Sequence, residues 1–404
     1  MSSATAAAPL NAAPVGYDDG IVKKFLIATV VWGIVGMLVG VWIALELAWL
    51  PVIALIAIDS RRLSSSESSL KAFFAHAFAS LVFAWGVAFV FGATGRLELA
   101  ALAGVDVARP LFFQVGVVLV IVGLIARGAV APFHPWSPDA YEGAPSFVAT
   151  HIATVAQTTT FLVLLRVMHA LGPGEAGFSQ DVASRVPDLL AVLGCLGLAW
   201  GHAMALVQVG LRRLVGWLGV GQAGFFTLAL VEARTEGGEA LLLALFASAL
   251  AVTGVLATLG SLSHHERACE QVGDLSGMMQ RSPIRAALLA LFFLSLVGFP
   301  GTVGFVARVE LLGALEQTGH RWLVLAGLAA TVLALISIGR PLLAMLRPAT
   351  SKRDPSRALT NEQFVLALCG LGVVYFGVAP LLGAGHLSGL LTDWIEAALA
   401  SLRT

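Results

Sequence analysis

The sequence predicts an all-α, polytopic membrane protein of about eleven transmembrane helices, in two halves that each contain a broken helix. Hydrophobic residues make up 58% of the 404 residues, charged residues only 12%, and the mean hydropathy is +0.89. Soluble domains are about a quarter charged, so this composition is typical of a chain that crosses the bilayer several times. The net charge is zero. We therefore expect the lipid bilayer, and no nucleic acid, as a partner.

The predicted spans are apolar stretches near the roughly 20 residues that a membrane helix needs. They lie near 24–39, 41–59, 71–92, 111–130, 146–170, 187–210, 213–232, 239–262, 283–317, 321–346 and 361–382. The first two share one apolar run, 25–58, which is long for one span and short for two. The ninth is overlong and is interrupted by "GFPGTVGF" at 298–305.

The two ends of the chain differ from its apolar body. Residues 1–22 are rich in alanine and proline and lack the apolar core of a signal peptide, so we expect a disordered tail. Residues 386–402 have apolar residues at helical spacing, which predicts an interfacial helix or, alternatively, a helix that docks on a partner. Between them we expect a first five-helix repeat over 23–170 and a second over 187–346. The last region, 361–404, combines a span with the interfacial helix.

Basic residues fall mainly on one side of this topology. If loops alternate from the N-terminus, the N-terminal side holds Lys23, Lys24, Arg61, Arg62, Lys71, Arg212, Arg213, Arg267, Arg281, Arg285, Arg347, Lys352, Arg353 and Arg357. The opposite side holds Arg96, Arg109, Arg185, Arg234, Arg321 and Arg403. Cytoplasmic loops carry an excess of lysine and arginine, so we expect a cytoplasmic N-terminus.

Ionisable groups inside a bilayer are costly and usually mark a pathway or an internal pair. Within the predicted spans they are Glu46, His76, Arg127, His151, Arg166, His202, Arg308, Glu310 and Arg340. Glu46 must be paired or protonated, so it belongs either to an ion pair with an arginine or to a polar path. His202 is either a hydrogen-bonded packing residue or a proton carrier.

Polar side chains also line one face of the fifth span. His151, Thr154 and Thr158 recur at helical spacing, with Gln157 at the edge of the stripe. Such a stripe must face protein or water rather than lipid. Threonines bonded back to their own helix explain part of it, but not His151 and Gln157.

Both halves contain a span broken by proline and glycine. "VAPFHPWSPDAYEGAP", residues 130–145, follows Arg127, and "GFPGTVGF" precedes Arg308. Paired breaks of this kind indicate inverted repeats. A break frees backbone groups that need water or buried partners, so we expect a small hydrated pocket beside each arginine.

The first break carries further expectations of its own. Three of its four prolines, Pro132, Pro135 and Pro138, are expected to prevent a regular helix and to let the chain turn. Asp139 and Glu142 are expected to cap the following helix or to pair with arginines of the N-terminal side. His134 is the residue of this stretch that could exchange protons with the cytoplasm.

No cofactor is expected. Cys195, Cys269 and Cys369 are scattered and read as small apolar residues. His264 and His265 lie beside Glu266, but no further ligand follows at a useful spacing, so no metal site is predicted. The sequence holds no dinucleotide fingerprint and no cysteine cluster.

"PFHPWSPDAYEGAP" resembles the motif of the proton-conducting antiporter-like subunits of respiratory complex I and of related Mrp-type antiporters, and most resembles the subunit N type. The stretches "ALELAWLP", "ESSLKAFF", "ALVQVGLRRLVGWLGVGQAGF", "DLSGMMQRSP" and "SLVGFPGTVGFVAR" agree in order, over roughly residues 25–346. The resemblance implies two inverted five-helix repeats, a broken helix in each, and a polar axis halfway across the membrane. Members of the subunit N type usually have three more N-terminal spans.

In the family that axis is a glutamate followed by three lysines that pass protons. The glutamate corresponds to Glu46, whereas Arg127, Gln157 and Arg308 stand at the three lysine positions. A buried lysine can lose its proton, but arginine stays charged and glutamine carries no proton. Any relay would have to use Glu46, histidines and water, with His76, His151 and His202 as the candidates in the spans.

The resemblance implies a non-catalytic membrane-arm subunit of a complex I-like assembly in the bacterial inner membrane. Other membrane subunits would be its partners, and redox chemistry would belong to partner subunits. Proton translocation is expected to be impaired, or rerouted through histidines. Two alternatives are the membrane subunit of a gradient-driven inorganic-carbon uptake system and a free-standing cation/proton antiporter. Both need a working proton path, which the missing lysines disfavour.

Overall fold

The computed structural model describes residues 38–59, 61–96, 99, 110–170, 180–262, 269–348, 360–380 and 393–400. Most of the first predicted span, the N-terminal tail and the pair His264–His265 lie outside these residues. Within the described residues all regular structure is helical, apart from one isolated β-bridge between Gly210 and Gln271. The predicted all-α class is confirmed.

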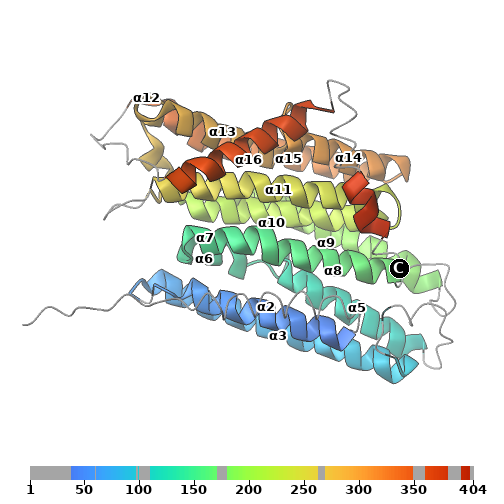
Figure 1. The fold of residues 1–404 in the computed structure, drawn as a ribbon. Helices are drawn as coiled ribbons and strands as arrows, with labels where there is room; N and C mark the ends of the chain where they lie inside the picture. Colours follow the sequence, from blue (N-terminus) through green and yellow to red (C-terminus); the bar gives the residue numbers. More distant parts are fainter. Residues whose placement is uncertain are drawn as a thin grey trace, which may run out of the picture.

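The helices of the first half are α2 Leu38–Ile56, α3 Leu63–Thr94, α5 Pro110–Arg127, α6 Trp136–Gly143, α7 Ser146–His151 and α8 Gln157–Ala170. In Figure 1, α2, α3 and α5 lie along the lower edge of the molecule, and α6, α7 and α8 lie between them and the second half. A π-helical turn, η1 Ile152–Ala156, joins α7 to α8, so that these three elements form one continuous span. Figure 1 shows the long helices of both halves side by side, with their axes in broadly the same direction.

The second half continues the same layered arrangement. Its elements are α9 Gln180–Val207, α10 Leu211–Ala229, η2 Leu230–Glu232, α11 Glu236–Ser261, η3 Val272–Leu275, α12 Met278–Arg281, α13 Pro283–Val297, α14 Val303–Gln317, α15 Arg321–Leu346 and α16 Thr360–Val378. Among the described residues, seven helices are long and apolar enough to cross a membrane, and three shorter apolar helices accompany them. The total of eleven spans stays a prediction.

Two polar contacts each join loops that the alternating topology places on the same side. Arg62 and Glu270, from two loops placed on the N-terminal side, form an ion pair of 3.0 Å. His320 and Glu232, from two loops placed on the opposite side, approach to 3.2 Å. The apolar middle of the bundle therefore lies between two polar ends.

Close helix contacts in the first half depend on glycine. A Cβ atom at Gly116 of α5 would lie 2.8 Å from the backbone nitrogen of Val90 in α3, and one at Gly86 would lie 2.6 Å from that of Val120. Small residues let membrane helices approach closely and gain dispersion contacts. The pairing of α3 with α5 fixes the position of Arg127, the last residue of α5.

Residues 393–400 are helical, in agreement with the prediction of a helix near the C-terminus. Leu399 is buried, and its Cδ2 lies 3.3 Å from where a Cβ of Gly238 would stand. Trp394 is exposed. This helix therefore packs through one apolar face on the start of α11, and its interfacial role stays a prediction.

We predict that Gly116→Ala destabilises the protein, because the added methyl group would overlap the backbone of α3. The expected loss is about 1–3 kcal/mol, seen as a lower thermal unfolding midpoint in detergent. Gly92→Ala is the matched control, since no atom lies within 4 Å of a Cβ at this exposed position of α3. Equal midpoints for the two variants would contradict the close packing of α3 on α5.

Candidate functional site

The first break lies between α5, which ends at Arg127, and α6, which begins at Trp136. Pro132 and Pro135 lie in the non-helical stretch, as predicted. The prediction for Pro138 is wrong, because this residue lies in the first turn of α6. A backbone N–H in that turn has no intrahelical partner, so its absence in proline does no harm there.

Polar groups of other helices satisfy the backbone around α6. The Oγ of Ser65 donates to the carbonyl of Gly143 over 2.6 Å. Nη1 of Arg212, at the start of α10, donates to the carbonyl of Ala144 over 2.8 Å. These bonds attach the short helix to both halves of the protein, which meets the need of a broken helix for buried partners.

Both acidic residues of α6 pair with Arg213, in agreement with the prediction of arginine partners, and Asp139 also pairs with Lys71. Lys71 Nζ lies 2.7 Å from Asp139, and Arg213 lies 3.1 Å from Asp139 and 3.0 Å from Glu142. Lys71 is the only lysine in the part of the chain that the structure describes. It is half exposed at the end of the bundle, so no described lysine lies in the apolar middle.

Glu46 of α2 and Arg127 of α5 form an ion pair inside the first half. Nη2 of Arg127 donates to Oε1 of Glu46, and the same oxygen accepts from the hydroxyl of Ser80. Trp42 Nε1 donates to Ser80 Oγ over 2.7 Å. The guanidinium is completely buried, and its Nε and Nη1 have no hydrogen-bond partner. Glu46 therefore forms the ion pair with an arginine that the sequence allowed, and its membership in a polar path stays a prediction.

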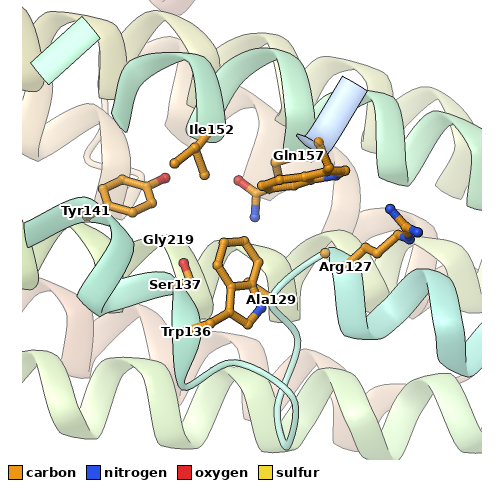
Figure 2. A pocket seen from close by; sticks show the side chains of 10 residues that line it. Arg127, Ala129, Trp136, Ser137, Tyr141, Ile152, Gln157 and Gly219 are labelled. Carbon is orange, nitrogen blue, oxygen red and sulfur yellow. The ribbon is translucent and has the colours of Figure 1, made fainter. Parts of the chain in front are cut away.

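A small cavity adjoins this ion pair. Its volume is about 10 Å³, room for about one water molecule, and its lining includes Arg127, Trp136, Tyr141, Gln157 and Gly219. Figure 2 shows the amide of Gln157 above Trp136, between Tyr141 and Arg127. This first cavity, as we name it, matches the pocket expected beside Arg127.

Gln157 is the first residue of α8 and directly follows the π-helical turn. π-Helical turns are rare in proteins, and those that occur are often found at functional sites. Helical periodicity placed Gln157 at the edge of a polar stripe, but the sequence contained no signal for the π-helical turn that precedes it. The threonines of the stripe bond to their own helix, as Thr154 Oγ1 does to the carbonyl of Thr150 over 2.7 Å.

The histidines near the first break lie among aromatic rings. His76 packs on Trp49 and Trp136, with ring centroids 3.7 and 4.5 Å apart. Its Nδ1 lies 2.8 Å from the carbonyl of Ala72, whereas Nε2 has no partner. His134 is buried, with its ring centroid 5.3 Å from that of Trp217, and its exchange of protons with the cytoplasm stays a prediction.

The second break separates α13 from α14, and Arg308 folds back across it. Its Nη2 donates to the carbonyl of Leu296 over 2.8 Å, and Nη1 donates to Thr331 Oγ1 over 2.6 Å. Its Cζ lies 4.2 Å from the centroid of Phe225. Gly298 has φ 75°, and a Cβ there would lie 2.3 Å from Arg308 Cδ. Arg308 therefore covers the C-terminal end of α13.

A second cavity, of about 20 Å³, lies beside Arg308. Its lining includes Gln222, Ser248, Ser295 and Gly304, from α10, α11, α13 and α14. Nε2 of Gln222 donates to the carbonyl of Leu296, which Arg308 also contacts. The pocket expected beside the second arginine is present.

The remaining candidates are dispersed. His202 is buried, with Nδ1 2.8 Å from the carbonyl of Leu198 and its ring centroid 6.1 Å from that of Phe225. His151 is half-buried at the end of α7. Glu310 and Arg340, which we counted among the costly groups in the spans, lie on the exposed surface.

The structure therefore brings Glu46, Arg127 and Gln157 together around the first cavity and places Arg308 at the second. Sequence reasoning missed Ser80 and Gln222, the polar neighbours of the two arginines. Serine and glutamine carry no charge, and each stands alone in an apolar stretch, so hydropathy gives little signal for them.

We predict strong coupling between Glu46 and Arg127. Removal of one partner from a buried ion pair costs about 3–5 kcal/mol, because the other charge stays buried without compensation. Glu46→Gln and Arg127→Gln should each lower the unfolding midpoint, and the double variant should be more stable than the sum of the two losses predicts. Additive losses in this double-mutant cycle would show that the two side chains do not interact.

Comparison with known proteins supports one family. Residues 36–334 match the family described as "NADH:quinone oxidoreductase/Mrp antiporter, TM". The NADH-quinone oxidoreductase subunit N 2 of Acidobacterium capsulatum is 31% identical over 364 residues, which cover 88% of this chain and 72% of that protein. The subunit N of Bdellovibrio bacteriovorus is 29% identical over 347 residues, which cover 83% and 70%.

Solved structures agree with this assignment. The chain is similar to one of respiratory complex I from Thermus thermophilus, with a TM-score of 0.73, 26% identity, and coverage of 86% of this chain and 74% of that one. A chain of the Mrp complex from Dietzia sp. has the same fold, with a TM-score of 0.75, 20% identity, and coverage of 91% and 74%. The protein described here therefore belongs to the NADH:quinone oxidoreductase/Mrp antiporter family of membrane proteins.

Proposed function

We propose that the chain is a membrane-arm subunit of a complex I-like assembly and that it translocates few or no protons itself. The curated relatives described above are subunits N of NADH-quinone oxidoreductases, which supports the type of assembly. One observation supports the loss of translocation: Arg127, Gln157 and Arg308 occupy the positions at which the family resemblance expects proton-carrying lysines.

The surroundings of the two arginines favour fixed charge over proton exchange. Arginine stays protonated in proteins, and both guanidinium groups are buried and bonded. Arg127 pairs with Glu46, and Arg308 covers the end of α13. In these positions the arginines act as structural and electrostatic elements of the frame.

A histidine relay is the main competing hypothesis. His76 keeps Nε2 without a partner beside Trp136, which lines the first cavity, and this observation favours it as an entry point. His76 and His202 both direct Nδ1 at a carbonyl of their own helix, a bond that packing histidines commonly make. The alternatives of inorganic-carbon uptake and free-standing antiport would need such a relay to work.

The proposal includes a location and partners. The bacterial relatives support a location in a bacterial inner membrane. The excess of lysine and arginine on one side supports an N-terminus in the cytoplasm. Other membrane subunits would cover part of its exposed apolar surface, and lipid the rest. Electron transfer would take place in partner subunits, and this chain would contribute no redox centre.

We predict that the chain, tagged and purified in mild detergent, brings down several other membrane proteins in fixed ratio. The expected result is one large complex by size-exclusion chromatography and mass spectrometry. The proposal would be contradicted if the chain purified alone, as a monodisperse species, and exchanged cations for protons in liposomes. That result would favour the free-standing antiporter.

We also predict that variants of this chain leave proton pumping by the intact assembly unchanged. In proteoliposomes, Glu46→Gln and Gln157→Ala should give the wild-type number of protons per electron. His151→Ala and His202→Ala test the relay in the same assay, with subunit composition checked for each preparation. A clear fall in the ratio for either histidine variant, with assembly intact, would establish translocation through this chain.

A further inference from the structure

The two buried arginines differ in their electrostatic compensation. Arg127 has the carboxylate of Glu46 as a partner. Arg308 is equally removed from solvent, but the groups that it contacts are neutral: a carbonyl, a hydroxyl and a phenyl ring. Among the described residues no carboxylate forms an ion pair with it. An uncompensated buried charge is costly, so the site of Arg308 favours an additional negative charge.

The second cavity offers a place for that charge. It adjoins Arg308 and is also lined by Ser295, which is 2% exposed and whose Oγ has no hydrogen-bond partner in the part of the chain that the structure describes. Ser248 contributes a second buried hydroxyl. Hydroxyl groups can turn their hydrogen toward an anion, so both serines can act as donors together with the guanidinium.

The N-terminal end of α14 also favours a negative charge in the second cavity. Gly304 lines the cavity and lies in the first turn of this 15-residue helix, where backbone N–H groups have no intrahelical acceptor. The N-terminal end of a helix carries partial positive charge and is a common site for anions. The side chain of Thr302, which precedes the helix, does not cap it, because its Oγ1 donates to the carbonyl of Phe299.

We propose that the second cavity binds one small monovalent anion of the halide class, with chloride as the occupant. A volume of about 20 Å³ accepts a single particle near the size of a water molecule, which excludes phosphate, sulfate and carboxylates. A water molecule would satisfy Ser295 but would leave the charge of Arg308 uncompensated. We expect no anion in the first cavity, because Glu46 already neutralises the charge of Arg127 there. This inference does not rest on the proposed function.

The test measures chloride binding directly. ³⁵Cl NMR line broadening is recorded on the purified full chain, together with any subunits that accompany it, and bromide is then added as a competitor. The expected result is excess line width that scales with protein and that bromide removes. Replacement of chloride by gluconate at constant ionic strength should also lower the unfolding midpoint, since a ligand that binds only the folded state stabilises it.

Variants locate the site. Arg308→Gln should abolish the chloride-dependent line width, and Ser295→Ala should weaken chloride binding several-fold. The exposed Arg340→Gln is the control and should keep wild-type broadening. If Arg308→Gln does not accumulate in cells, the double variant Ser248→Ala/Ser295→Ala is measured instead, and it should lose most of the chloride-dependent line width. Wild-type broadening in that double variant, or equal unfolding midpoints in chloride and gluconate, would overturn the proposal.

Discussion

The arrangement of this protein depends on one constraint: backbone groups freed by a helix break inside an apolar body must find polar partners. At the first break, Ser65 and Arg212 donate to the carbonyls at the end of α6. At the second break, the carbonyl of Leu296 accepts from both Gln222 and Arg308. Polar side chains therefore stand beside both breaks, and the two cavities lie next to them.

The same constraint explains why arginine suits the second break. A guanidinium group can reach a carbonyl, a hydroxyl and an aromatic face at the same time, and it keeps its charge when buried. Gly298 makes room for its side chain and takes the left-handed conformation that ends α13. A lysine has a single ammonium group and could not make the same planar set of contacts. Arg308 thus forms a fixed structural contact at this break.

The sequence predicted the class, the broken helices and the pockets beside both arginines, because hydropathy and Pro/Gly placement are local signals. It could not predict which buried acceptors each arginine reaches, since Leu296 and Thr331 meet Arg308 only through tertiary packing. For related reasons, the sequence did not predict the π-helical turn before Gln157 or the position of Pro138 inside α6. Backbone geometry of one turn depends on the neighbours of that turn, and periodicity does not encode it.

α10 has a consequence for how the halves act on each other. Gly219 lines the first cavity and Gln222 the second, three residues apart, which is about 4.5 Å along a helix. The apolar length of α10 is buried, so protein surrounds the helix. A small rotation or shift of this one helix would therefore reshape both cavities in the same movement. α10 would thus act as a mechanical link between the surroundings of Arg127 and those of Arg308.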